Sequence, residues 1–149
     1  MKMRLNDMKA NVSGLPAGFG GMRKKWNEIN GRFEITAAAI IQRPAVDDKG
    51  QPILYRVGDR AGEQVMDRQT ALQIKMENGD LVLIRTNSRR ITSLFEGCIS
   101  DKTAPYRNRF GDEVFSCSDL PEGWLKFVPY EYKYSNGKVG EIADLAEAD

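Results

Sequence analysis

The side chains that could do chemistry in this chain are cysteines, lysines, tyrosines and carboxylates, because its 149 residues include no histidine. Without histidine the chain lacks the usual general base at neutral pH, the histidine-activated nucleophiles and the ligands of nearly every catalytic zinc site. No spacing brings Cys98 or Cys117 beside a base, and the adjacent carboxylates Asp112 and Glu113 would point to opposite faces of a strand. We therefore predict no catalytic residue and a protein that is not an enzyme.

Phosphate-binding and metal-binding motifs are also missing from the sequence. No G-x-x-x-x-G-K-[ST] loop occurs, and Gly18, Gly20 and Gly21 follow no predicted strand, as a dinucleotide fingerprint would require. Asp47 and Asp48 lie in a loop that lacks the further acidic positions and the closing glutamate of an EF-hand. We predict no cofactor and no metal, which leaves binding functions.

Two segments interleave cations with aromatic rings, a pattern that is typical of nucleic-acid contacts but that also occurs on ordinary solvated surfaces. Residues 44–138 carry fourteen Lys/Arg and fourteen Asp/Glu, whereas nucleic-acid-binding domains usually show a clear basic excess. Nucleic-acid binding is therefore the alternative function. Its contacts would come from the clusters Arg23-Lys24-Lys25-Trp26 and Tyr106-Arg107-Asn108-Arg109.

Residues 1–21 are expected to form a flexible N-terminal arm. The segment 13–21 contains four glycines and one proline, so ordering it is entropically costly. Either the arm is a disordered terminus, or it becomes ordered when its two isolated apolar side chains bind a partner or a second copy. In the second case the partner-binding residues are Leu15, Phe19, Arg23, Lys24, Lys25 and Trp26.

The stretch from Ile53 to Phe95 is expected to form the fold core that positions these groups. Asp67 is a candidate helix N-cap and Gly79 a candidate helix end, and Ala71, Leu72 and Met76 fall on one helical face between them. The predicted elements are a strand over 53–57, a helix over 67–78, a buried central strand over 81–84 and a returning antiparallel strand over 90–95.

Further elements are expected on both sides of this core. Residues 22–30 fit a short helix, with a hairpin turning at Asn30-Gly31 as the alternative. A strand over 33–42 contains three consecutive alanines, which leave room for a packed helix or a ligand to approach closely. Strands are also expected at 114–116 and through Tyr130, Tyr132 and Tyr134, whose stripe is either a core wall or a binding platform.

The expected architecture is an α+β domain over 22–138 with a mostly antiparallel sheet of five or six strands, one main packed helix and the flexible arm. Residues 139–149 carry four acidic side chains and no cation, and form an acidic tail in which Ile142 and Leu145 dock as one helical turn. No apolar run is long enough for a membrane helix, and no signal peptide is recognised. We therefore expect a cytoplasmic protein with reduced cysteines.

The order of strand, polar turn, capped helix and strand between Tyr55 and Thr92 resembles small proteins of unknown function from phages and mobile elements. The resemblance covers about a quarter of the chain and carries no functional motif. It implies a phage-type accessory protein, located in the cytoplasm or in a virion. The expected function is protein binding or assembly, with a partner or neighbouring copies engaged through the N-terminal arm.

Overall fold

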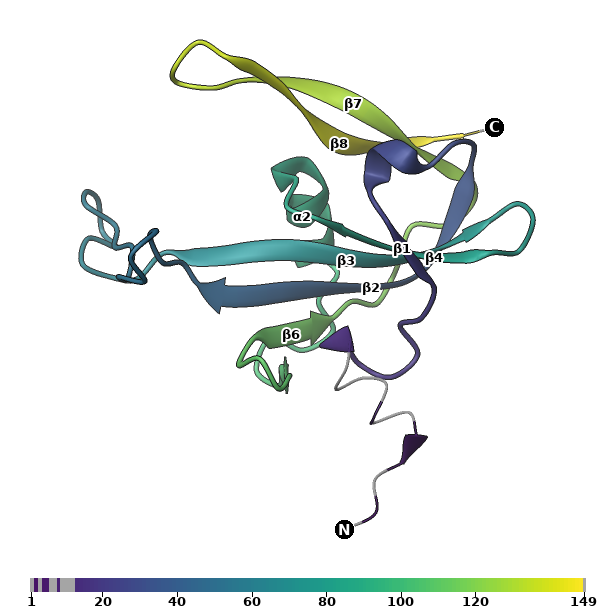
Figure 1. Cartoon of the computed structure of the whole chain (residues 1–149), viewed down its shortest axis with the longest axis horizontal. Coiled ribbons are helices and arrows are strands. Elements are labelled where there is room, and N and C mark those ends of the chain that lie inside the picture. Colours follow the sequence, from purple (N-terminus) through teal and green to yellow (C-terminus); the bar gives the residue numbers. More distant parts are fainter. Residues whose placement is uncertain (1, 3, 6–7, 9–12, 149) are drawn as a thin grey trace.

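The computed structural model describes residues 2, 4–5, 8 and 13–148 (Figure 1). Its described strands form one eight-stranded mixed sheet, which is larger than the five or six strands expected, and the α+β class fits only roughly because strands dominate. The elements in chain order are β1 (Met22–Lys24), the 3₁₀ turn η1 (Trp26–Glu28), β2 (Phe33–Pro44), β3 (Met66–Met76), β4 (Leu81–Thr86), α2 (Arg89–Glu96), β5 (Tyr106–Arg107), β6 (Glu113–Ser116), β7 (Leu125–Lys133) and β8 (Val139–Glu147).

The central strands follow a Greek-key order. Three consecutive antiparallel strands, β2, β3 and β4, lie side by side, and β6 returns to pair with the free edge of β2. The short β1 runs parallel to β4 and covers its other edge, so β4 is internal as predicted. β7 meets the start of β2 at one register pair, Leu125 with Phe33, and then leaves the sheet to form a hairpin with β8.

The main hydrophobic core lies on the sheet face covered by α2 and by the β7–β8 hairpin (Figure 1). Phe33, Leu72 and Ile84 reach this core from three strands, and Ile91 and Phe95 reach it from α2; all five are at most 1% exposed. Alternate residues of each strand point to opposite faces, so the neighbours of these side chains face the other side of the sheet.

The opposite face of the sheet holds a second, smaller core built around Leu15. This side chain is fully buried against Ala39, Ala71 and Leu83. The small alanine side chains do leave room for a close approach, as the sequence indicated, and the group that approaches is the chain's own N-terminal segment. Leu15 was expected to lie outside the compact body, and that expectation is wrong; residues 1, 3, 6–7 and 9–12 of the arm lie outside the described residues.

The predicted helix over 67–78 is wrong, because these residues belong to β3 and to the turn after it. Residues Thr70 to Ile74 are buried on both sides, since Leu72 and Ile74 enter the main core while Ala71 faces the Leu15 core. A strand buried on both faces lacks the alternation that distinguishes it from a helix. The tight turn that Gly79 allows, with φ +92°, joins two strands and does not end a helix.

The predicted strand over 90–95 is also wrong, because these residues form α2. Ser88 is the N-cap of this helix, and its Oγ accepts a hydrogen bond from the Ile91 N–H at 3.4 Å. Ile91, Thr92 and Phe95 are buried at helical spacing. With residues 67–78 in a strand, the element order that suggested a resemblance to phage proteins is not present in the fold.

Three smaller expectations change as well. The strand expected over 53–57 is not part of the central sheet but lies in an irregular segment, 45–65, which projects from the end of the β2–β3 pair (Figure 1). Residues 22–30 contain β1 and η1 in place of one helix. Ile142 and Leu145 lie in β8, where pairing with β7 replaces the predicted helical turn. The strands expected over 33–42, 81–84 and 114–116 and through Tyr130 and Tyr132 are confirmed.

Candidate functional site: an arginine face with an adjoining pocket

Strand alternation brings three arginines onto the face of the sheet that Leu15 partly covers. Arg85 lies two residues after Leu83 on β4, and Arg43 lies two residues after Ile41 on β2, so both point to the same side as these buried residues. Arg23 of β1 is the register partner of Leu83. We call Arg23, Arg43, Arg85 and the intervening Gln69 of β3 the arginine face.

Arg85 is the central charge of the arginine face. Its guanidinium Nη2 donates to the Gln69 Oε1 at 3.3 Å, and within the described part of the chain it has no ion-pair partner. Burial lowers the pKa of Arg85, and the neighbouring positive charges of Arg23 and Arg43 lower it further, against the opposing effect of Asp112. An arginine that is partly desolvated and surrounded by like charge is one that an anion would stabilise.

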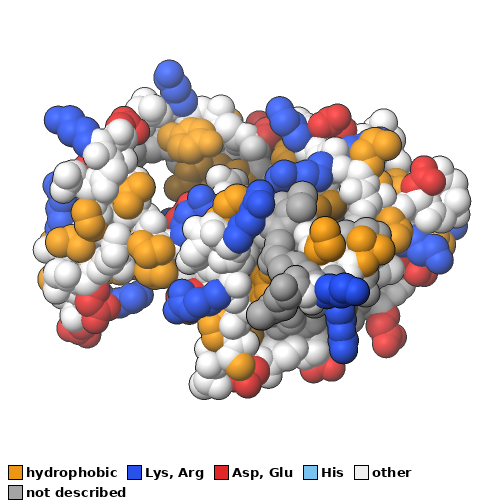
Figure 2. Space-filling model, turned by 60° about the horizontal axis from the view of Figure 1, so that its bottom comes forward, with side chains coloured by type: hydrophobic (Ala, Val, Ile, Leu, Met, Phe, Trp, Pro, Cys, Tyr) orange, Lys and Arg blue, Asp and Glu red, His pale blue; other side chains and the backbone are white. Residues whose placement is uncertain are grey.

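Many other arginines of the described chain are paired with carboxylates. Arg43 itself donates to Asp112 at 3.3 Å, which leaves Arg23 and Arg85 as the uncompensated charges of the arginine face. Figure 2 shows cations and anions interspersed over one face of the molecule, without a single block of positive charge. The remaining pairs are Arg32 with Glu77, Arg60 with Glu63, Arg68 with Glu96, Arg90 with Asp144 and Arg107 with Glu113.

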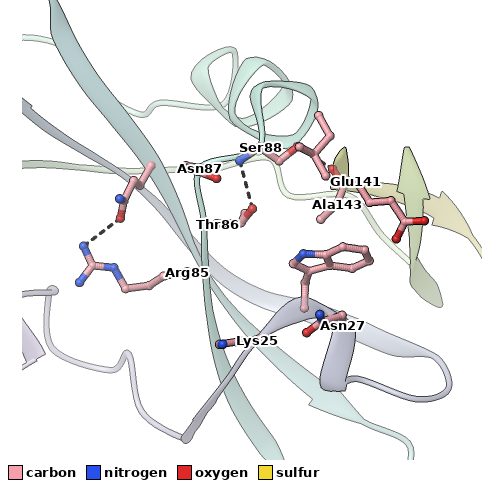
Figure 3. Close-up of a pocket in the computed structure, with 11 residues that line it drawn as sticks. Lys25, Asn27, Arg85, Thr86, Asn87, Ser88, Glu141 and Ala143 are labelled. Carbon is pink, nitrogen blue, oxygen red and sulfur yellow. Dashed lines mark hydrogen bonds between the residues drawn. The ribbon is translucent and has the colours of Figure 1, made fainter. Parts of the chain in front are cut away.

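A pocket of about 270 Å³ adjoins the arginine face where β4 ends, and we call it the β4-end pocket. Lys25 and Asn27 reach it from the segment around η1, Asn87 follows β4, and Glu141 comes from β8 (Figure 3). Arg85 extends on the side of β4 away from Glu141, so positive and negative groups lie at opposite ends of the site. Trp26 and Gln69 also line the pocket.

The structure separates the two cation–aromatic clusters that the sequence suggested. Arg23 and Lys24 of β1 and the following Lys25 are exposed at one edge of the main sheet, whereas Tyr106 and Arg107 form β5 at the other edge. Tyr106 packs against the Leu15 core, and Arg107 pairs with Glu113 at 3.7 Å. Arg109 stacks over the Phe110 ring at 4.8 Å. The side chains of the second cluster are therefore largely engaged in contacts within the protein.

The expected partner-binding residues also differ in how far they are buried in the protein. Leu15 is buried in its own protein, and Phe19 and Trp26 are partly buried against the Leu15 core and the main core, respectively. Sequence reasoning missed Arg85, Arg43 and Gln69. The signal that identifies them is their two-residue spacing from Leu83, Ile41 and Ala71, which becomes readable only once β3 and β4 are known to pair.

The tyrosine stripe is exposed and does not form the wall of a core. Tyr130, Tyr132 and Tyr134 retain 42%, 48% and 46% of their accessible surface. The Tyr132 and Tyr134 rings contact each other edge to face at 5.1 Å, and the Arg90 guanidinium lies 4.1 Å from the Tyr130 ring centroid. The stripe lies on the β7–β8 hairpin, away from the arginine face (Figure 1).

The described residues contain no group of three or more metal-ligating side chains, and no described helix is long and apolar enough to cross a membrane. Comparison with known proteins finds no matching family model, no matching curated protein and no matching solved structure.

Proposed function

We propose that the protein binds nucleic acid through the arginine face and the adjoining Lys25. The observation that carries this proposal is Arg85, a partly buried arginine beside Arg23 and Arg43 that has an amide and no carboxylate as its hydrogen-bond partner. A phosphate group supplies the missing negative charge and matches the planar donor geometry of a guanidinium. Lys25, exposed directly after β1, lines the same pocket as Arg85 and extends the positive surface.

The charge balance of the chain is compatible with this function once ion pairs are considered. A net charge of +1 predicts no general attraction to polyanions. Within the described chain, five arginines elsewhere are paired with carboxylates, whereas Arg23 and Arg85 are not. Binding would depend on the local group Arg23, Lys25 and Arg85, not on the charge of the whole molecule.

The strand order supports the same function by topological analogy. A five-stranded, partly open Greek-key barrel is the OB-fold, which binds oligonucleotides on the face of its second and third strands. If the two-residue β5 and the flanking β1 and β8 are left out, β2 is the first of five strands and β3 and β4 are the second and third. Gln69 and Arg85 lie on these two strands. The analogy concerns topology alone, and the argument for function rests on the side chains.

The test is the affinity of a fluorescein-labelled oligonucleotide, measured by fluorescence anisotropy at a fixed, low salt concentration. The double variant Arg23→Gln, Arg85→Gln should bind at least tenfold more weakly than the wild type, because two phosphate contacts are lost. The matched control is Arg60→Gln, Arg68→Gln, which removes the same charge from two arginines paired with Glu63 and Glu96. Equal weakening in both double variants, or no binding by the wild type, would overturn the proposal.

A second candidate function, protein binding or assembly, is favoured by the projecting segment 45–65. Four of its large apolar side chains are exposed, the most exposed being Val57 at 83%, and several hydrophobic side chains are visible on the projecting lobe at the left of Figure 2. Exposed apolar groups gathered on one projection are typical of protein contacts. The other three are Val46, Ile53 and Leu54.

The mass of the protein in solution tests this second function. If copies associate through the projecting segment, the double variant Leu54→Asp, Val57→Asp should sediment as a smaller species than the wild type. Both side chains are exposed, so the change should leave the fold intact. A wild type that is monomeric at all concentrations and after nuclease treatment in high salt would exclude self-assembly.

A further inference from the structure

The β4-end pocket is continuous with the arginine face, because Arg85 and Gln69 belong to both. A strand of nucleic acid whose phosphates contact Arg23 and Arg85 would therefore pass the mouth of this pocket. Lys25 lies at the same mouth and adds a third cation. What enters the pocket must be a part of the strand other than its phosphate, since Glu141 lies at the far end and would repel an anion.

Some polar groups of the pocket already have hydrogen-bond partners within the protein, and others can still bind a ligand. The Thr86 Oγ1 accepts from the Ser88 N–H at 3.1 Å, and the Ser88 Oγ donates to the Ala143 carbonyl at 2.5 Å. The side-chain amides of Asn27 and Asn87 have no hydrogen-bond partner within the described part of the chain. Amides offer both donors and acceptors, which is what the edge of a nucleobase requires.

The pocket also has a flat aromatic wall and a limited size. Trp26 lines it and is only partly buried, so part of its indole surface is open to a ligand. Its volume of about 270 Å³ lies just below the range of about 300–1,000 Å³ that drug-sized ligands occupy. Such a space suits one nucleobase but not a stack of base pairs. A base can reach an aromatic wall in this way only after it leaves its own stack.

From these observations we infer that the β4-end pocket receives one unstacked base, with Trp26 as its stacking surface, and that the ligand is consequently single-stranded nucleic acid. This inference rests on the proposed function and names its substrate class. The phosphates flanking the inserted base contact Arg85 and Lys25, and the base edge contacts Asn27 or Asn87.

The chain offers an internal control for the experiment, because it contains two tryptophans. Trp124 lies outside the pocket, and the Arg32 guanidinium sits 4.6 Å from its ring centroid. The variant Trp124→Leu therefore leaves Trp26 as the only indole reporter, and Trp26→Leu leaves Trp124. Leucine keeps an apolar side chain at each site while removing the stacking surface.

A labelled single-stranded dC oligonucleotide of twelve or so residues is titrated into each full-length variant, and oligonucleotide anisotropy and intrinsic tryptophan fluorescence are read together. We expect quenching in Trp124→Leu and none in Trp26→Leu, together with about fivefold to a hundredfold weaker binding by Trp26→Leu, the range that the loss of one stacked base produces. A duplex of the same length should bind more weakly and cause no quenching.

Two results would overturn the inference while leaving the proposed function intact. One is binding by Trp124→Leu without quenching, together with unchanged affinity in Trp26→Leu. The other is equal quenching by the duplex. If Trp26→Leu fails to fold, the fluorescence of Trp124→Leu still decides between these outcomes. Absence of any oligonucleotide binding by the wild type would remove the proposed function and, with it, this inference.

Discussion

Leu15 shows how a single side chain joins a glycine-rich segment to the sheet. Its environment is made of small residues on two strands, Ala39 and Ala71, together with Leu83. Because the side chain is fully buried, it contributes the burial of a whole leucine, about 1.5–3 kcal/mol, toward ordering the residues around it. Asn108 adds a polar contact, since its Nδ2 donates to the Gly14 carbonyl at 3.0 Å.

The variant Leu15→Ala should therefore destabilise the protein by about 2–5 kcal/mol, since it removes a fully buried side chain and leaves a cavity. Chemical denaturation measures this change. Leu94→Ala is the matched control because Leu94 is 56% exposed on α2, and its loss should change stability by less than about 0.5 kcal/mol. A similar, small effect in both variants would mean that Leu15 is not packed as described.

Cys117 provides a second prediction at the same scale. Burial, and to a smaller extent the nearby Cys98, raises the pKa of the Cys117 thiol to about 11. In the unfolded chain a thiol has a pKa of about 8.5. The folded state therefore holds this proton more tightly, so its contribution to stability is complete below about pH 8.5 and is lost as the pH rises toward 11.

The free energy of unfolding, measured from pH 7 to pH 10.5, should fall more steeply in the wild type than in Cys117→Ser. The Cys117 thiol should also react slowly with iodoacetamide at pH 8 until the protein is unfolded, since the thiolate is the reactive form. The pKa prediction would fail if Cys117 were alkylated at pH 8 in the folded protein as fast as in the denatured one.

At the scale of the element, β1 depends on an unusually close backbone approach. Gly21 has φ +124°, and a Cβ at this position would lie 2.7 Å from the Leu81 carbonyl oxygen. No other residue fits this conformation without strain, so Gly21 permits the N-terminal segment to enter the sheet beside β4. The contact also positions Arg23 of the arginine face, two residues later.

Replacing Gly21 by alanine should accordingly destabilise the protein by about 1–3 kcal/mol and weaken oligonucleotide binding as β1 shifts. Gly20→Ala is the neighbouring control, because Gly20 has an ordinary φ and a Cβ added there would meet nothing within 4 Å. Thermal unfolding and oligonucleotide anisotropy of the two variants measure both effects. If Gly20→Ala proved as harmful as Gly21→Ala, the close approach would not be the cause.

The elements also show what sequence reasoning could reach. The strand over 81–84 was predictable as a short apolar run bounded by turn residues, and the strand over 33–42 from the alternation of its apolar residues. β3 was not, because the residues around Leu72 are buried on both faces and Asp67 and Gly79 mimic the caps of a helix. α2 was missed because its N-terminal end is similar in composition to a turn. Its Ser88 N-cap follows Asn87 directly, and the pair has the composition of a hairpin turn.

The same error hid the candidate site. Arg23, Lys24 and Lys25 were identified from their sequence because they are consecutive. Arg85 and Gln69 come together only through the pairing of β3 with β4, which a helical interpretation of residues 67–78 excludes. The sites that depend on adjacency in the sequence were thus found, and those that depend on strand register were not.

For the whole molecule, the important property is that six arginines of the described chain are paired with carboxylates, whereas the cations in and beside β1 are not. Three cations at or beside the arginine face carry no ion pair within the described chain: Arg23, Lys25 and Arg85. Counterion release predicts that the logarithm of the binding constant for a single strand falls with the logarithm of salt concentration, with a slope of about −0.7 for each phosphate contact. Three contacts give a slope of about −2.

The last prediction is that this slope identifies which charges bind. For Arg23→Gln, Arg85→Gln the slope should drop to about −0.7, since two of three phosphate contacts are removed. For Arg60→Gln, Arg68→Gln the slope should stay near the wild-type value, because the charges of those arginines are already paired with Glu63 and Glu96. Anisotropy titrations from about 25 to about 200 mM salt measure both slopes. A steep wild-type slope that neither variant changes would locate the phosphate contacts elsewhere on the molecule, with the tyrosine stripe and Arg90 as the next surface to test.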